Sequence, residues 1–139
     1  MPELPPEAMK DTETGAEAFV QYYIDLLNYV AMFPRVGVLE QYGSADCGTC
    51  GTFEKNVAEQ VQGETFQDGP SSVVQELDAL PSENGYRVFV TAEAPAFQRI
   101  KKSGEVVETI GRGKKAEVAF DVYMPTDTFI VEAVRTVDN

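Results

Sequence analysis

Two cysteines have the most distinctive spacing in this 139-residue chain. Cys47 and Cys50 are its only cysteines, and they form a C-x-x-C motif. Such a pair could supply half of a zinc site, act as a thiol–disulfide redox pair, or form a structural disulfide. The zinc interpretation lacks a second pair of ligands, because the sequence has no histidine and no further cysteine. The redox interpretation has the right spacing before a predicted helix, but it lacks the preceding buried strand and βαβ unit.

A second group of candidates lies on a long predicted helix. Asp25, Asn28 and Tyr29 could perform acid–base chemistry if this helix lines an internal pocket, because a buried aspartate there could abstract a proton. The alternative is that they continue the polar side of the helix and face water. Asp121 with Tyr123, on a predicted strand, has the same ambiguity. The absence of histidine excludes triads with a histidine base and imidazole proton shuttles.

Aromatic residues are candidates for binding an apolar ligand. The chain has six tyrosines and eight phenylalanines. They could line a pocket, or they could pack in the core with their hydroxyl groups at its rim. The candidate pocket residues are Tyr22, Tyr23, Tyr29 and Phe120.

The formal net charge is −12, which argues against nucleic-acid binding, because that function needs a basic surface. One segment differs, since residues 99–115 have a local charge of +4. It predicts either a surface for anionic lipid, cell-wall polymer or an acidic partner, or a solvated strand pair whose lysines discourage edge pairing. The basic residues of this segment are Arg99, Lys101, Lys102, Arg112, Lys114 and Lys115.

The long helix must position several of these candidates. Apolar residues recur every three or four positions over residues 16–31, which is the helical period. Thr14 and Glu17 predict a capping box at its start, and Pro34 predicts its end, so the helix is expected over residues 15–33. Its narrow polar side predicts that it is largely buried.

The rest of the chain predicts an α+β fold. A helical turn is expected within residues 35–42 and a second helix over residues 49–62, ending at Gly63. The period then changes to two, with strands expected at residues 73–77, 86–93, 97–101, 105–110, 116–124 and 128–137. Helices followed by strands predict N-terminal helices packed in a curved antiparallel sheet. Residues 1–12 are expected to form a flexible proline-rich tether, and residues 13–139 a single domain.

Three runs of residues resemble a known family. They are residues 14–20 (TGAEAFV), 23–29 (YIDLLNY) and 47–50 (CGTC). They resemble an uncharacterised family of actinobacterial lipoproteins with the nuclear-transport-factor-2-like (SnoaL-like, cystatin-like) α+β cone, over residues 2 to about 60. The resemblance implies a mature domain with an added Met1, whose signal peptide and lipidated cysteine lie outside this chain. It also implies an extracellular, membrane-anchored location, where Cys47 and Cys50 would form a disulfide.

We therefore expect an exported or lipid-anchored cell-surface domain that binds a ligand or partner and is not an enzyme. The expected partner is an envelope component or a small apolar ligand, with no cofactor, no metal and no nucleic acid. The domain is expected as a monomer or homodimer, near the membrane only through its anchor. The alternatives are a pocket enzyme using carboxylate acid–base chemistry, of isomerase or hydrolase type, and a thiol–disulfide function at Cys47 and Cys50.

Overall fold

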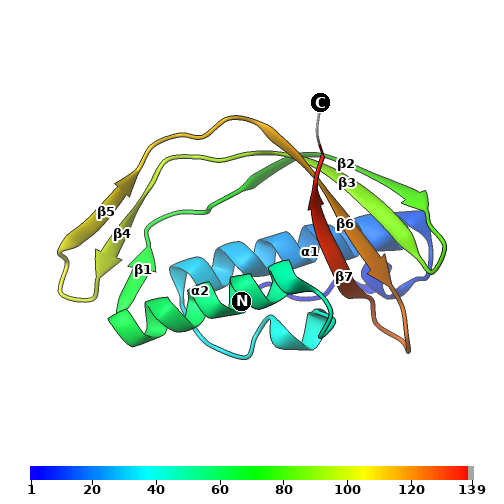
Figure 1. Cartoon of the computed structure of the whole chain (residues 1–139), viewed down its shortest axis with the longest axis horizontal. Helices are drawn as coiled ribbons and strands as arrows, with labels where there is room; N and C mark the ends of the chain where they lie inside the picture. The colour runs from blue at the N-terminus through cyan, green and yellow to red at the C-terminus, as the bar shows by residue number, and fades with distance from the viewer. Residues whose placement is uncertain (138–139) are drawn as a thin grey trace.

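The computed structural model describes residues 1–137, in which two α-helices lie beneath an arch of strands (Figure 1). The helices are α1 (Glu13–Met32) and α2 (Gly48–Gly63), and two short 3-10 helices, η1 (Pro6–Met9) and η2 (Glu40–Tyr42), accompany them. The strands are β1 (Thr65–Gln67), β2 (Val73–Pro81), β3 (Tyr86–Glu93), β4 (Phe97–Lys101), β5 (Val106–Ile110), β6 (Ala116–Tyr123) and β7 (Ile130–Thr136). The predicted α+β class is confirmed.

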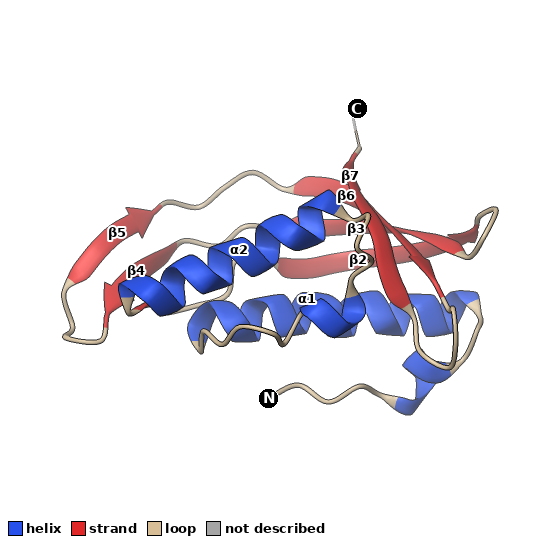
Figure 2. Cartoon of the chain, turned by 60° about the horizontal axis from the view of Figure 1, so that its bottom comes forward, coloured by secondary structure: helices blue, strands red, loops and turns tan. Residues whose placement is uncertain are grey.

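The strands form two antiparallel sheets, with the orders β1-β4-β5 and β2-β3-β6-β7. The connections from β3 to β4 and from β5 to β6 run close together, because the Gly113 N–H donates to the Ala94 carbonyl at 2.8 Å. The two sheets are therefore consecutive parts of one bent surface. Figure 2 shows both helices on the same side of this surface.

The first helix begins two residues earlier than predicted. The Thr12 side chain caps it, because its Oγ1 accepts a hydrogen bond of 2.9 Å from the Gly15 N–H. The predicted capping box of Thr14 and Glu17 is therefore wrong, and the Glu17 carboxylate binds the Ala79 N–H of β2 instead. The helix ends at Met32, close to the end predicted from Pro34.

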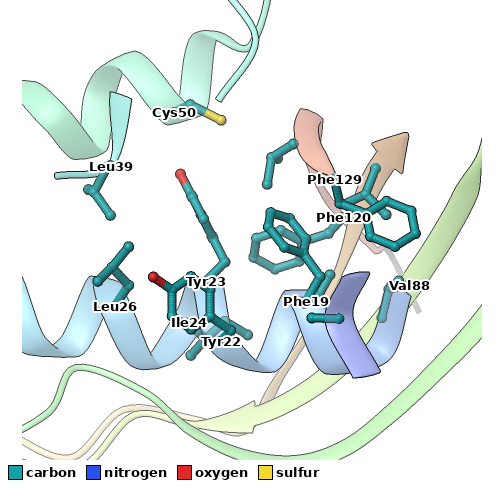
Figure 3. Close-up of a cluster of buried hydrophobic side chains, with 14 of the residues drawn as sticks. Phe19, Tyr22, Tyr23, Ile24, Leu26, Leu39, Cys50, Val88, Phe120 and Phe129 are labelled. Atoms are coloured by element: carbon teal, nitrogen blue, oxygen red, sulfur yellow. The ribbon is translucent and has the colours of Figure 1, made fainter. Parts of the chain in front are cut away.

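The buried side of α1 forms the centre of the core, as predicted. Phe19, Tyr23 and Leu26 are fully buried, and Figure 3 shows Phe19 beside Phe120 of β6 and Phe129, which directly precedes β7. The ring centroids of Phe19 and Phe129 are 5.7 Å apart. Large aromatic side chains contribute much of the hydrophobic stabilisation in such a core, so α1 must pack here for the sheet to be covered.

The disulfide between Cys47 and Cys50 lies at the start of α2. The Cys47 Sγ accepts a hydrogen bond of 3.1 Å from the Cys50 N–H, and both cysteines are buried. The helix then runs within one residue of the predicted limits. Its end differs in detail, because Glu64, not Gly63, adopts the left-handed conformation, with φ 54°.

The N-terminal segment packs on the domain. Ala8 in η1 is fully buried and Leu4 contacts the hydrophobic core, which differs from the flexible tether expected for residues 1–12. The contact is close because Gly15 has no side chain: a Cβ there would lie 1.9 Å from the Lys10 carbonyl oxygen. A proline-rich composition predicts an extended chain, but it does not reveal this local fit.

The remaining differences concern short or irregular strands. β1 is not predicted, because three residues between a helix end and a Gly-Pro turn are too few to show a period. β2 extends beyond the predicted residues 73–77, and β7 is shorter than the predicted residues 128–137. Residues 138–139 of the single-domain prediction lie outside the described part of the chain.

Candidate functional site

A cavity of about 640 Å³ lies between the two helices and the inner face of the arch. Its size falls in the range typical of small-molecule sites. Both helices and strands from both sheets contribute to its wall. The chemistry of the site therefore depends on which side chains each element supplies.

One wall of the cavity is apolar and comes from the four-stranded sheet. Val90 and Val118 are opposite one another in the register of β3 and β6, and residues two positions away share their face. Side chains of both helices extend this wall. The apolar lining residues are Val90, Ala92, Val118, Phe120 and Val134 of the sheet, with Ile24, Leu27, Val30 and Ala31 of α1 and Phe53 and Val57 of α2.

A second wall is polar and comes from the three-stranded sheet, the segment before β2, and parts of the helices. Gln67 and Arg99 are direct partners in the register of β1 and β4. The Ser71 hydroxyl donates to Gln67 Oε1 at 2.8 Å. The polar lining residues are Asn28, Asn56, Glu59, Gln60, Thr65, Gln67, Ser71, Ser72 and Arg99.

Two buried polar atoms of this wall have no hydrogen-bond partner in the described part of the chain. They are Oε1 of Gln60, a residue with only 8% exposure, and Nε of Arg99. The Arg99 guanidinium also forms an ion pair through Nη1 with Glu108 of β5. A buried polar atom left without a partner costs about 1–3 kcal/mol, so these two atoms need water or a ligand.

The predicted acid–base group is not brought together. Asp25 is exposed, and its carboxylate accepts a hydrogen bond of 2.9 Å from the Gln21 side chain. Tyr29 stacks on Phe33, with the ring centroids 5.0 Å apart. Asn28 does line the cavity, but all its hydrogen bonds hold the segment before β2: it donates to the Ser72 carbonyl at 2.8 Å and accepts from two backbone N–H groups.

Of the four aromatic residues predicted for a pocket, Phe120 lines the cavity. The hydroxyl groups of Tyr22 and Tyr42 share a hydrogen bond of 3.2 Å. The pKa of Tyr22 is raised mainly by burial and, to a smaller extent, by this hydrogen bond. Tyr23 extends from α1 toward α2, near Cys50 (Figure 3), and burial together with the nearby Glu54 carboxylate raises its pKa. Both phenols therefore remain neutral near pH 7 and belong to the core.

The second candidate pair from the sequence, Asp121 and Tyr123, lies on β6. The Asp121 carboxylate binds Arg87 at 2.7 Å and Arg135 at 2.9 Å. These ion pairs occupy both carboxylate oxygens. Asp121 is therefore a structural ion-pair centre and is not part of the cavity lining.

The basic segment is only partly free of acidic partners. Arg99 pairs with Glu108, and the remaining ion pairs are Lys101 with Glu105 at 3.6 Å and Arg112 with Glu93 at 3.2 Å. Lys102, Lys114 and Lys115 are exposed and form no ion pair within residues 1–137. Arg99 thus belongs to the cavity as well as to the basic segment.

The polar wall is the part of the site that sequence reasoning misses. A signal for Gln60 exists, because Gln60 follows the buried Val57 by three residues and therefore shares its helix face. Gln67 and Arg99 give no such signal, since their proximity depends on the pairing of β1 with β4.

Among the described residues, no group of three or more His, Cys, Asp or Glu side chains could hold a metal ion. No helix in this part of the chain has the length and apolar character to cross a membrane.

Comparisons with known proteins support the fold and identify a family. No curated protein matches the chain. The crystal structure of the intermembrane space region of chloroplast protein ARC6 is similar, with a TM-score of 0.60 and 12% sequence identity over 94% of this chain and 99% of that one. This likeness shows the fold alone. The model of a family of unknown function, DUF6318, matches residues 1–126, and because this match spans most of the sequence, the chain belongs to that family.

Proposed function

We propose that this domain is a non-enzymatic binding protein that holds a small, mainly apolar ligand in the cavity beneath the arch. The observation that carries the proposal is that the four-stranded sheet lines the cavity with apolar residues, whereas the three-stranded sheet lines it with polar ones. Binding sites for small molecules are typically apolar with a few polar groups that fix orientation. A ligand with an apolar body and a polar end would match both walls.

The arrangement of carboxylates supports binding over acid–base catalysis. Glu59 is the carboxylate among the lining residues, and it is exposed on α2. The Asp25 carboxylate is also exposed and does not belong to the lining. General acid–base chemistry requires a positioned group within hydrogen-bond reach of the substrate, and these positions favour a site that orients a ligand without transforming it.

We also propose the finer fold and the location. A helix covered by a bent antiparallel surface, with a cavity between them, is consistent with the nuclear-transport-factor-2-like cone. The Cys47–Cys50 disulfide supports an extracellular location, because disulfides persist in oxidising compartments. The lipid anchor is proposed from the resemblance to actinobacterial lipoproteins. Two measurements on the protein in its native cells test this location: alkylation of free thiols, and partitioning into a detergent phase. Reduced cysteines and recovery in the aqueous phase would contradict it.

The cavity is tested with Nile red, a neutral dye that fluoresces in apolar surroundings. The purified domain should enhance its fluorescence, and Ala92→Trp, which places a large ring in the apolar wall, should abolish the enhancement. Thr91→Trp is the matched control, since adjacent strand residues point to opposite faces. Equal fluorescence with both variants would show that the dye binds elsewhere and would contradict the proposal.

A further inference from the structure

We propose that the ligand is a neutral amphiphile whose head group both donates and accepts hydrogen bonds, such as a hydroxyl or a carboxamide, and not a fatty acid. This inference rests on the proposed function and concerns the polar wall of the same cavity. It follows from the two buried atoms without partners and from the charges around them.

The first argument is hydrogen-bond complementarity. The Nε of Arg99 is a donor that needs an acceptor, whereas Oε1 of Gln60 is an acceptor that needs a donor. A hydroxyl or carboxamide can satisfy both atoms. An ionised carboxylate is an acceptor only, so it would satisfy Arg99 and leave the buried Gln60 oxygen without a partner.

The two groups lie at the same end of the cavity. Gln60 is near the C-terminal end of α2, which packs against β1. β1 in turn pairs with β4, where Arg99 is opposite Gln67. The strands that supply the apolar wall belong to the other sheet, so a bound amphiphile would place its head at Arg99 and Gln60 and its chain along Val90, Val118 and neighbouring residues.

The second argument is charge. Arg99 is the cation among the lining residues, and Glu108 already neutralises it through the ion pair at Nη1. Glu59, at the rim, adds a negative charge without an ion pair within residues 1–137. Arg99, its partner Glu108 and the lining residue Glu59 therefore sum to one negative charge, and the formal net charge of the whole chain is −12. Residues 99–115 carry a local charge of +4, but Lys102, Lys114 and Lys115, which form no ion pair within residues 1–137, do not line the cavity. The charge of the site and that of the whole chain both disfavour an anionic head group.

Glu108 is accordingly a specificity-determining residue that acts through Arg99. Its ion pair at Nη1 leaves the buried Nε without a partner, and it neutralises the positive charge that would attract a carboxylate. Removal of the Glu108 charge should free Arg99 to bind an anion through a charge-assisted hydrogen bond, which is stronger than a neutral one.

The experiment compares ligands that share one alkyl chain and differ in the head group. Decanamide, 1-decanol and decanoate are titrated into the purified domain at pH 7.5 by displacement of Nile red. The two neutral ligands should bind about tenfold or more tightly than decanoate, which is the effect expected from one unsatisfied polar atom and a repelling charge. Glu108→Gln should shift the preference toward decanoate by about tenfold.

Glu105→Gln is the matched control, because Glu105 lies on the same hairpin but pairs with Lys101 at 3.6 Å and should leave the preference unchanged. Gln60→Leu provides a second test: it removes the buried acceptor and should reduce the advantage of decanamide over decanoate. Tighter binding of decanoate to the unaltered domain, or equal shifts from Glu108→Gln and Glu105→Gln, would overturn this inference while leaving the binding function intact. Failure of all three ligands and of Nile red to bind would overturn the binding function itself.

Discussion

The Glu17 carboxylate on α1 accepts a hydrogen bond of 2.9 Å from the Ala79 backbone N–H on β2. β2 is an edge strand, because it pairs only with β3 within the described sheet. Edge strands expose backbone groups that can pair with other chains, and proteins often cover them. The Glu17 side chain covers one exposed backbone N–H of this edge and links α1 to the sheet through a hydrogen bond.

Substitution of Glu17 should show that this contact contributes to stability. Glu17→Ala should lower the free energy of unfolding by about 1–3 kcal/mol, because the partly buried Ala79 N–H loses its acceptor. Glu17→Gln should cost less, since the amide oxygen can still accept. Urea denaturation at pH 7 measures both changes. Asp25→Asn, on the exposed side of the same helix, is the control and should change stability by no more than about 0.5 kcal/mol.

Two helical glycines, Gly15 and Gly51, test the packing of the N-terminal segment on α1, because only Gly15 lies against that segment. A Cβ at Gly15 would lie 1.9 Å from the Lys10 carbonyl oxygen and 3.0 Å from that of Glu7, whereas a Cβ at Gly51 would meet nothing within 4 Å. Gly15→Ala should therefore destabilise the domain by about 1–3 kcal/mol, because backbone atoms must move. Gly51→Ala should stabilise it by up to about 1 kcal/mol, since alanine favours the helix.

Thermal denaturation of both variants separates these effects. Limited proteolysis adds a local measurement, because displacement of Lys10 should expose the segment before α1 to cleavage in Gly15→Ala. Equal stability of the two variants would show that the N-terminal segment does not pack on α1 as described.

The predictable part of the fold is the part with a clear hydrophobic period. β3 coincides with its predicted residues 86–93 because its alternation is regular, and α1 is recognised from its three- and four-residue spacing. The predicted start of α1 is two residues too late because Thr12 and Thr14 both suit a cap. In the structure Thr12 caps the helix, and Glu17, which the predicted capping box would use, binds Ala79, 62 residues away in the sequence.

The candidate site was less predictable because it depends on tertiary pairing. Sequence patterns place tyrosines on the apolar side of α1, but they do not distinguish a buried core residue such as Tyr23 from a cavity residue such as Phe120. The polar wall needs β1 to pair with β4, and β1 is too short to be recognised. Buried polar atoms without partners become visible only when the surroundings of Gln60 and Arg99 are known.

The disulfide should contribute little to global stability. Cys47 and Cys50 are three residues apart, so the bond closes a short loop and removes little entropy from the unfolded chain. Cys47→Ser with Cys50→Ser should lower the free energy of unfolding by about 2 kcal/mol or less, near the low end of the usual range. Urea denaturation of the double variant measures this loss, and a decrease of more than about 4 kcal/mol would show that the bond supports the whole fold and not only the start of α2.

The ion pairs of Asp121 predict a specific dependence of stability on pH. Burial of the carboxyl group opposes its ionisation, but hydrogen bonds and charges from Arg87 and Arg135 outweigh burial and lower the pKa of Asp121. A carboxylate with a lowered pKa in the folded state contributes stability above its unfolded pKa of about 3.9, and this contribution is lost as the pH falls through the folded pKa. Asp121→Asn should therefore be less stable than the unaltered domain at pH 7, and the difference should shrink as the pH falls below about 4.

Urea denaturation from pH 7 to pH 3 measures this difference in the free energy of unfolding. Asp78→Asn, at an exposed residue of the same sheet, is the control. A difference that is constant over this pH range would contradict the role of the two arginines.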